Sequence, residues 1–361
     1  MIDLRTSPFI DLAAVEAWDA WFRWREKSDL RDVSIEDTWR RVSSALAAVE
    51  PDLEARTWQA RFMDALAAWR LLPDERLLAG AGTGQPTCPD GVLHASLNAA
   101  GFACSGPATD ASMDLAALSD CAALAVRALD DAALLEGIAQ PHLRIGLIGV
   151  ADALALRGWS YDSDTGRMQA AAMARALAEG CLRGSITLAA TRGSCGHEAA
   201  EAAIARATLR GLPEELLHAV ARKGVRHLQL TAITSQPRLA LLANDVADAV
   251  DPLQGRNHAH VINAAGGQRT TVRSSGYALN VLHAEGNGPA AGTPDTLSDM
   301  SWMAQIKMRA ALQCWIDEPI DYPLLVTDDL GEAQRLEARR LAATHELGDP
   351  VWREAVALQS H

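Results

Sequence analysis

Several features are missing from this 361-residue sequence, and each absence excludes a class of protein. No run of about 18 apolar residues occurs, so we expect no transmembrane helix and no membrane partner. The N-terminus lacks a basic start followed by an apolar core, so no signal peptide is expected. The six cysteines form no C-x-x-C pair, and in a large chain without an export signal this pattern indicates a reduced, cytoplasmic protein.

Basic charge is also scarce. The chain has 33 Lys and Arg against 46 Asp and Glu, which gives a formal net charge of −13. A nucleic-acid-binding protein would present a basic face, so we expect no nucleic-acid partner. Hydrophobic residues make up 49% and charged residues 22% of the chain, which is typical of a globular protein rather than a disordered one.

Helical periodicity dominates what is present. The segment SIEDTWRRVSSALAAVEP, residues 34–51, has a capping-box pattern at Ser34 and Asp37 and apolar residues at helical spacing. Further helices are expected over residues 113–135, 147–157, 164–190, 197–209, 213–223, 299–316 and 330–345. Short strands are expected at 226–233 and 269–274, and a short apolar run lies at 323–327. The pattern predicts a mainly α protein with a few strands.

The stretch RLLAGAGTGQPTCPDGVLHASLN, residues 76–98, contains glycines at every second position from Gly80 to Gly84. A phosphate loop needs backbone N–H groups that converge at a helix N-terminus. The spacing here is G-x-G-x-G and not G-x-G-x-x-G, no Gly-Lys-Ser/Thr follows, and two prolines soon interrupt any helix. We therefore do not interpret the stretch as a phosphate cradle.

Six segments, in order along the chain, resemble the large catalytic chain of ribonucleotide reductases, and most closely its class II, adenosylcobalamin-dependent branch. They are RDVSIEDTWRRVSSALAAVE (31–50), RLLPDERLLAGAGTG (70–84), ASLNAAGF (95–102), RIGLIGVADALALRGWSYDS (144–163), VRHLQLTAITSQPRLALLANDVADAVDP (225–252) and MRAALQCWIDEPIDYPLLV (308–326). The third segment, residues 95–102, resembles a strand of the family, and the fourth segment, residues 144–163, resembles a helix. Each motif is weak alone, whereas six in the family's order are specific.

The resemblance also implies a truncated and degenerate form. In the family, a long region carrying most of the ten-stranded α/β barrel separates ala-gly-ala-gly-thr from an asn-pro-cys-gly-glu loop. Here Gly84 is followed at once by QPTCPDG, which resembles the residues just after that loop. We therefore expect an α/β remnant of the barrel with an N-terminal helical segment packed on a reduced core. The expected divisions are 1–75 (helical), 76–110 (irregular junction), 111–255 (remnant of the reductase domain) and 256–361 (C-terminal segment).

Cys88 and Asp90 are the only candidates for the family's radical cysteine and its carboxylate. Their spacing copies the family's, but Pro86 stands where an asparagine should hold the substrate hydroxyl. Thiyl chemistry also needs a shielded interior, which a chain without the barrel would not provide. The alternative reading is an ordinary loop cysteine. The reducing partner is missing as well, because Cys104 lies in the wrong register.

The family's phosphate loop, pro-thr-gly-thr-ile-ser, corresponds to residues 235–240. Ser235, Gln236 and Arg238 are the candidate nucleotide- or phosphate-binding residues of a degenerate loop. Pro237 replaces the glycine, which removes an N–H donor and fixes φ. Apolar side chains replace the hydroxyls that follow, and Arg238 can equally be a solvated surface residue.

Histidines suggest one further site. His258 and His260 share a face if NHAH forms a strand. Cys195 and His197 form another close pair, and the four together would make a Cys₁His₃ zinc site. Nothing in the sequence brings the pairs together, so we assign no metal from sequence and keep His258 and His260 only as candidates.

Three functions remain open. The first is a catalytically inactive, ribonucleotide-reductase-like protein with a binding, scaffold or regulatory role, whose partner is another copy or a full-length reductase. The second is an accessory part of a class II enzyme that contributes to ribonucleotide reduction when another chain completes it. The third is a new small-molecule or metal site on the old scaffold. We expect no cofactor in the first case and adenosylcobalamin if the family's activity is retained.

Overall fold

The computed structural model describes residues 8–27, 29–88, 90–103, 112–264, 267–284, 294–327 and 330–354. Its α-helices are α1 Leu12–Ala17, α2 Ile35–Ala47, α3 Asp52–Ala67, α4 Glu75–Gly80, α5 Leu115–Leu135, α6 Val150–Leu156, α7 Asp164–Arg192, α8 His197–Leu209, α9 Glu214–Lys223, α10 Pro237–Leu242, α11 Tyr277–Ala284, α12 Trp302–Gln313 and α13 Glu332–Thr344. Its strands are β1 Arg25–Glu26, β2 Asp29–Leu30, β3 Leu71–Pro73, β4 Val92–Asn98, β5 His142–Ile148, β6 His258–Asn263, β7 Arg269–Ser274, β8 Leu324–Val326 and β9 Trp352–Glu354. The mainly α fold with a few strands is confirmed.

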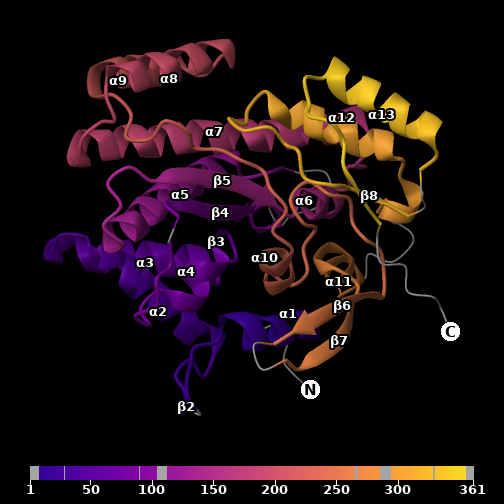
Figure 1. Ribbon diagram of the computed structural model, residues 1–361, viewed down its shortest axis with the longest axis horizontal. Coiled ribbons are helices and arrows are strands. Elements are labelled where there is room, and N and C mark those ends of the chain that lie inside the picture. Colours follow the sequence, from indigo (N-terminus) through magenta and orange to yellow (C-terminus); the bar gives the residue numbers. More distant parts are fainter. Residues whose placement is uncertain are drawn as a thin grey trace.

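A three-stranded sheet in the order β3-β4-β5 lies at the centre of the molecule (Figure 1). β3 runs antiparallel to β4, whereas β4 and β5 are parallel and are joined through α5. Parallel strands covered by helices are apolar on both faces, and the side chains from Ala95 to Asn98 and from Ile145 to Ile148 are buried accordingly. The other described strands pair two by two, so the described part of the chain contains no closed barrel.

The long helix α7 packs against α5 on one side of the sheet, and α8 and α9 lie beyond α7 (Figure 1). The approach of α5 and α7 requires glycine at position 180. A Cβ atom added to Gly180 would lie 2.1 Å from the carbonyl oxygen of Ser119 on α5. The backbones therefore pack at a distance that no other residue at this position permits without a shift.

Segments that lie far apart in the sequence meet on the other side of the molecule. α1 packs on α10 and on the β6–β7 hairpin, and Figure 1 shows this group below the sheet. Ala13 and Ala17 of α1 form a small core with Leu241 and Ile262. The hairpin is thus held against the body of the protein by the first described helix.

Several local predictions are confirmed and others are wrong. α2 begins at Ser34 with the expected capping box to Asp37, and β7 covers residues 269–274 as predicted. The strand predicted at 226–233 is wrong, because within this range only Thr231 forms a β-bridge, with Ile145. β5 lies where the fourth motif was expected to be helical, since the helix α6 begins only at Val150. The third motif, residues 95–102, resembles a strand of the family, and β4 covers its first part, up to Asn98.

Candidate functional site

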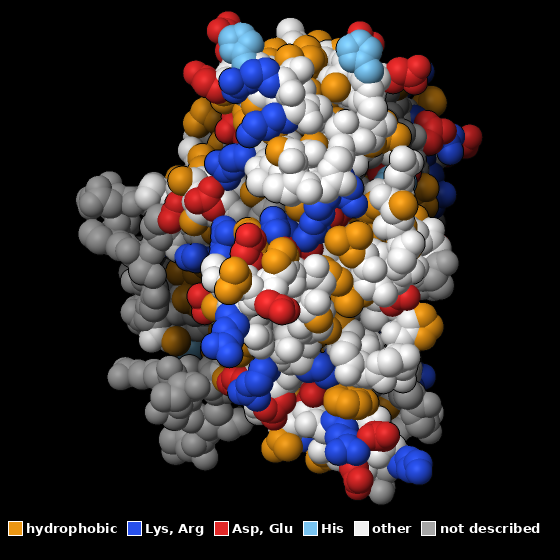
Figure 2. Space-filling view, turned by 90° about the vertical axis from the view of Figure 1, so that its left-hand side faces the viewer, with side chains coloured by type: hydrophobic (Ala, Val, Ile, Leu, Met, Phe, Trp, Pro, Cys, Tyr) orange, Lys and Arg blue, Asp and Glu red, His pale blue; other side chains and the backbone are white. Residues whose placement is uncertain are grey.

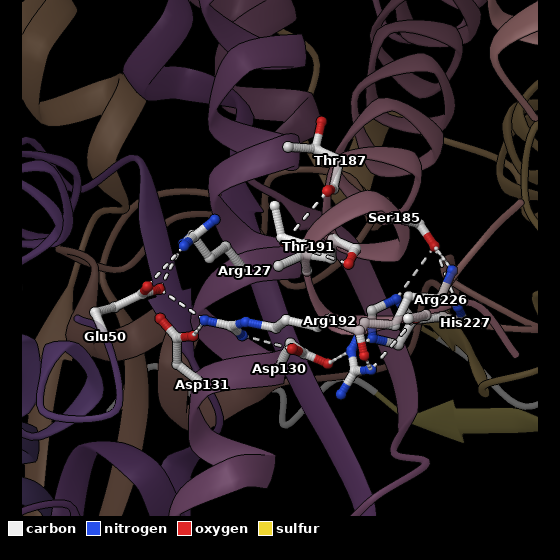
Figure 3. Close-up of polar contacts among 12 residues, drawn as sticks. Glu50, Arg127, Asp130, Asp131, Ser185, Thr187, Thr191, Arg192, Arg226 and His227 are labelled. Carbon is white, nitrogen blue, oxygen red and sulfur yellow. Dashed lines mark hydrogen bonds and ion pairs between the residues drawn. The ribbon is translucent and has the colours of Figure 1, made fainter. Parts of the chain in front are cut away.

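A buried polar cluster lies between α2, α5, α7 and the segment that follows α9 (Figure 3). It joins three carboxylates to three guanidinium groups, from Glu50, Asp130, Asp131, Arg127, Arg192 and Arg226. Both aspartates have fully buried side chains, and the Glu50 side chain is only 1% exposed. Such burial is tolerated only when the charges are paired, and the numbers of positive and negative groups match.

Arg192, the last residue of α7, is the centre of this cluster. Its guanidinium lies 2.5 Å from a carboxylate oxygen of Asp130, 2.6 Å from one of Asp131 and 2.8 Å from one of Glu50. Arg127 forms a bidentate ion pair with Glu50, with contacts of 2.6 and 2.7 Å. The helix end is thereby tied to α5 and to the loop after α2.

The surroundings shift the pKa values of the carboxyl groups in opposite directions. Burial raises the pKa of Asp131 to about 7 despite the adjacent guanidinium, and its Oδ2 is buried without a hydrogen bond. Burial would also raise the pKa of Asp130, but the imidazole and the guanidinium groups around it outweigh burial and hold this pKa well below its usual range. Asp130 is therefore the permanent anion of the cluster.

Ser185, His227 and Asp130 form a chain of hydrogen bonds that resembles a hydrolytic triad in composition. Ser185 Oγ lies 3.2 Å from His227 Nδ1, and His227 Nε2 lies 3.1 Å from Asp130 Oδ1. Burial lowers the pKa of His227, so the ring is neutral, donates from Nε2 and accepts at Nδ1. Ser185 Oγ also accepts two backbone N–H groups at 3.1 Å, and all three side chains are buried. The arrangement fixes the segment after α9 and offers no accessible nucleophile.

Cys88 lies in the core and not at an open site. Its side chain is 3% exposed, its thiol contacts the carbonyl oxygen of Val92 at 3.5 Å, and burial raises its pKa. Asp90 is exposed and engaged elsewhere, because its carboxylate lies 3.3 Å from Arg76 and accepts the N–H of Val92. Gly80 is the last residue of α4, and Gly82 and Gly84 follow it, at the end of the helix that presents carbonyl groups rather than N–H groups. Cys104, the other cysteine considered, lies outside the described residues.

The loop that corresponds to the family's phosphate loop is filled by a carboxylate of this chain. Ser235 Oγ donates to Asp248 Oδ2 at 2.5 Å, and the backbone N–H of Gln236 donates to Asp248 Oδ1 at 2.6 Å. Pro237 is the first residue of α10 and offers no N–H. Asp248 is buried, so its carboxylate takes two donors that an incoming anion would need. No sequence motif predicted this role for Asp248.

Arg238 points away from the loop. Its guanidinium pairs with Glu75 at 3.2 Å and lies 4.9 Å above the ring of Trp21. The side chain is 53% exposed, so this ion pair contributes little to stability. Of the three candidate phosphate-binding residues, two therefore bind Asp248 and the third binds the N-terminal helices.

The two candidate histidines do meet, but not with Cys195 and His197. His258 and His260 project from the same face of β6, and their rings lie 4.8 Å apart. Each Nε2 atom lies 2.9 Å from a carboxylate oxygen of Asp245, in the turn after α10. The four residues do not form a Cys₁His₃ site, because His197 lies on α8, on the opposite side of the sheet from β6 (Figure 1). Asp245 was missed because it lies thirteen positions before His258, outside any metal-binding spacing motif.

A surface hollow between α3, α5 and α7 has a basic and aromatic lining. Arg127 lies 3.8 Å and Arg61 4.5 Å from the centre of the Trp58 ring. Figure 2 views the molecule from the left-hand side of Figure 1. It shows Lys and Arg side chains spread from the top to the bottom of this face, with Asp and Glu among them. Arg127 is already paired with Glu50, and Arg183, also in the lining, pairs with Asp120 at 2.6 Å. The charges of the hollow are therefore largely satisfied within the chain.

No helix among the described residues is both long and apolar enough to cross a membrane.

Residues 94–264, from β4 to the end of β6, match the family model described as ribonucleotide reductase, barrel domain. The match covers slightly less than half of the chain. No curated protein matches the chain with significance. Over residues 94–264, this chain is therefore similar to the barrel domain of ribonucleotide reductase.

Proposed function

We propose that this protein is a ribonucleotide-reductase-like pseudoenzyme that acts by binding another protein and not by reducing nucleotides. The observation that carries the proposal is the occupation of the former phosphate loop by Asp248. A nucleotide phosphate would have to displace a buried carboxylate that has two hydrogen bonds, and Pro237 has removed another donor. Binding energy for the substrate's most strongly charged group is thus lost.

The cysteine chemistry supports the same proposal. A radical cysteine must face the substrate inside a shielded cavity, whereas Cys88 faces a backbone carbonyl within a packed core. The three-stranded sheet also leaves no barrel interior within the described residues. These residues do not fit adenosylcobalamin chemistry.

The partner is proposed from the relationship of residues 94–264 to the reductase barrel domain. We propose that it is a second copy of this chain or a full-length reductase. Light scattering gives the mass of the isolated chain, and co-sedimentation with a full-length reductase tests the second partner. A tight homodimer without affinity for any reductase chain would exclude a role in regulating a full-length reductase.

Calorimetric titration with a nucleoside diphosphate, a nucleoside triphosphate and adenosylcobalamin tests the loss of chemistry. We expect no binding of any of these ligands at micromolar concentrations. Arg238→Ala is the matched variant, because it removes the cation nearest in sequence to the loop, which here pairs with Glu75, without touching Asp248. Micromolar nucleotide binding that weakens in this variant would contradict the proposal. It would favour an accessory part of a class II enzyme, for which Cys88→Ser in a reconstituted reductase assay is the next test.

A further inference from the structure

A cluster of metal-ligating groups lies where the β6–β7 hairpin meets the turn after α10. Its members are one carboxylate, from Asp245, and two imidazoles, from His258 and His260. One ligand atom from each residue lies within 4.8 Å of the others. The cluster is independent of the loop at residues 235–238, so it bears on a function beyond the one proposed above.

The backbone directs the carboxylate toward the hairpin. Asn244 and Asp245 both have positive φ angles, 64° and 61°, in a conformation that Asn and Asp adopt more readily than most residues. The carbonyl oxygen of Asp245 accepts the N–H of Tyr277, which fixes the turn against α11. Asp245 is only 7% exposed. An unusual backbone conformation is therefore used to place a buried anion beside two imidazoles.

The hydrogen bond of His258 leaves the other nitrogen available for a metal. Its Nδ1 atom lies 2.7 Å from the carbonyl oxygen of Gly255, which can only accept, so Nδ1 carries the proton. In the neutral ring, Nε2 then has a free lone pair, and Nε2 is the atom that faces Asp245. Metal-binding histidines are typically oriented in this way, by donation of the second N–H to a backbone carbonyl.

Two atoms of the cluster are buried without a hydrogen bond. They are Asp245 Oδ2 and His260 Nε2, although each lies 2.9 Å from a polar atom of the cluster. Both atoms are held by ion-pair contacts of poor hydrogen-bond geometry, and buried polar atoms are rarely left with such contacts alone. A cation bound between them would satisfy both atoms at once.

The ligand types select the metal. Two imidazoles and one carboxylate suit zinc, ferrous iron and neighbouring ions, whereas magnesium and calcium prefer oxygen atoms alone. In a tetrahedral zinc site with bonds of about 2.0–2.1 Å, ligand atoms lie about 3.3 Å apart. The two 2.9 Å contacts lie within a few tenths of an ångström of this spacing, whereas ligand atoms separated by up to 4.8 Å must approach each other by up to about 1.5 Å.

The cluster also has an open side. Asp245 and His258 line a small hollow together with Gly255, Ser275 and Gly276. A fourth ligand from solvent can enter there, because three protein ligands leave one tetrahedral position free. We propose that Asp245, His258 and His260 bind one divalent first-row transition metal ion, with its fourth position open to this hollow.

The test begins with the full chain stripped of metal by a chelator. Calorimetric titration with Zn²⁺ is expected to show one tight equivalent per chain, and Co²⁺ is expected to give the intense visible absorption of a four-coordinate site. Fe²⁺ titrated without oxygen distinguishes iron from zinc as the preferred ion. Mg²⁺ at the same concentration should not compete. If none of these transition metal ions binds stoichiometrically, the proposal is overturned.

Variants locate the site. His260→Asn and Asp245→Asn should each weaken Zn²⁺ binding by more than ~100-fold, because each removes a direct ligand, whereas loss of outer-shell partners alone costs 10–100-fold. His197→Ala is the matched control, because His197 is 86% exposed on α8 and pairs only with Glu201. Thermal melting without metal shows whether each variant folds, and Zn²⁺ should raise the melting temperature only of the wild type and the control. Equal Zn²⁺ binding by a folded His260→Asn variant would overturn the proposal, whatever the outcome of the nucleotide titrations.

Discussion

Replacement of Asp130 by asparagine removes the central anion of the buried charge cluster. The carboxylate of Asp130 is fully buried and contacts Arg192 and Arg226 at 2.5 Å and His227 at 3.1 Å. An amide keeps one acceptor atom but turns its N–H groups toward groups that also donate. The variant therefore leaves two guanidinium groups, whose side chains are only 14% and 11% exposed, with one neutral oxygen atom between them.

The expected loss follows from these contacts. A hydrogen bond to a charged group contributes roughly 1.5–3 kcal/mol. An amide oxygen in the place of Oδ1 loses the bond to Arg192 and weakens the bonds to Arg226 and His227, because the acceptor is no longer charged. Removal of one member of a buried ion pair generally costs about 3–5 kcal/mol, which agrees. We therefore expect Asp130→Asn to lower the free energy of unfolding by about 3–5 kcal/mol. Urea unfolding followed by circular dichroism, with both m-values compared, measures this difference.

Two further variants make the test specific. Asp120→Asn breaks an exposed ion pair with Arg183 and should cost less than about 1 kcal/mol. Arg226→Met removes a cation, and the double variant with Asp130→Asn restores the balance of charge. The free energy of unfolding should therefore fall less in the double variant than the sum of its decreases in the two single variants. Strict additivity, or a loss below about 1 kcal/mol for Asp130→Asn, would refute the claim that the charges act as one balanced unit.

Three other changes test separate features. Burial raises the pKa of Asp251 to about 7, so the folded protein holds a proton that the unfolded chain releases near pH 4. From pH 4 to 7 the wild type should therefore lose up to ~1.4 kcal/mol of stability per pH unit relative to Asp251→Asn, and parallel urea-derived pH profiles would contradict this. Gly180→Ala should cost about 1–3 kcal/mol in urea unfolding, because its methyl group meets the α5 backbone, whereas Gly331→Ala, with φ −64° and open space, should be nearly neutral; equal effects would be inconsistent with the packing argument. Alkylation of the native protein, followed by mass spectrometry, should modify exposed Cys314 well before Cys88, and equal rates would argue against a buried, inert Cys88 thiol.

The elements with strong local signals could be predicted from the sequence. α2 begins with a capping box, and α8 covers the predicted range 197–209, because periodicity and caps are properties of neighbouring residues. β5 and residues 226–233 are both short apolar runs, and periodicity cannot separate such runs. β5 became a strand beside β4. Residues 226–233 form only one β-bridge to β5, at Thr231, and the N–H groups of Leu230 and Thr231 donate to the side chain of Asp317.

The candidate sites were predictable only where their residues are neighbours in the chain. His258 and His260 share a face because β6 is a strand, in which residues two positions apart project to the same side. Asp245 and Asp248 reach their partners through left-handed turns and tertiary packing, which leave no spacing motif. The loss of a phosphate loop was visible at Pro237, but the carboxylate that fills the loop was not.

The wide spacing of the charge cluster along the chain also bears on the order in which the protein can fold during synthesis. Glu50 and Asp130 leave the ribosome before their partner Arg192, and Arg226 follows Asp130 by 96 positions. Burial of these carboxylates before their partners exist would cost several kcal/mol, so the contact between α2, α5 and α7 can close only late. A nascent chain that ends before Arg226 should therefore keep this region open to proteases, and protection should arise within a short interval of chain length after that residue emerges.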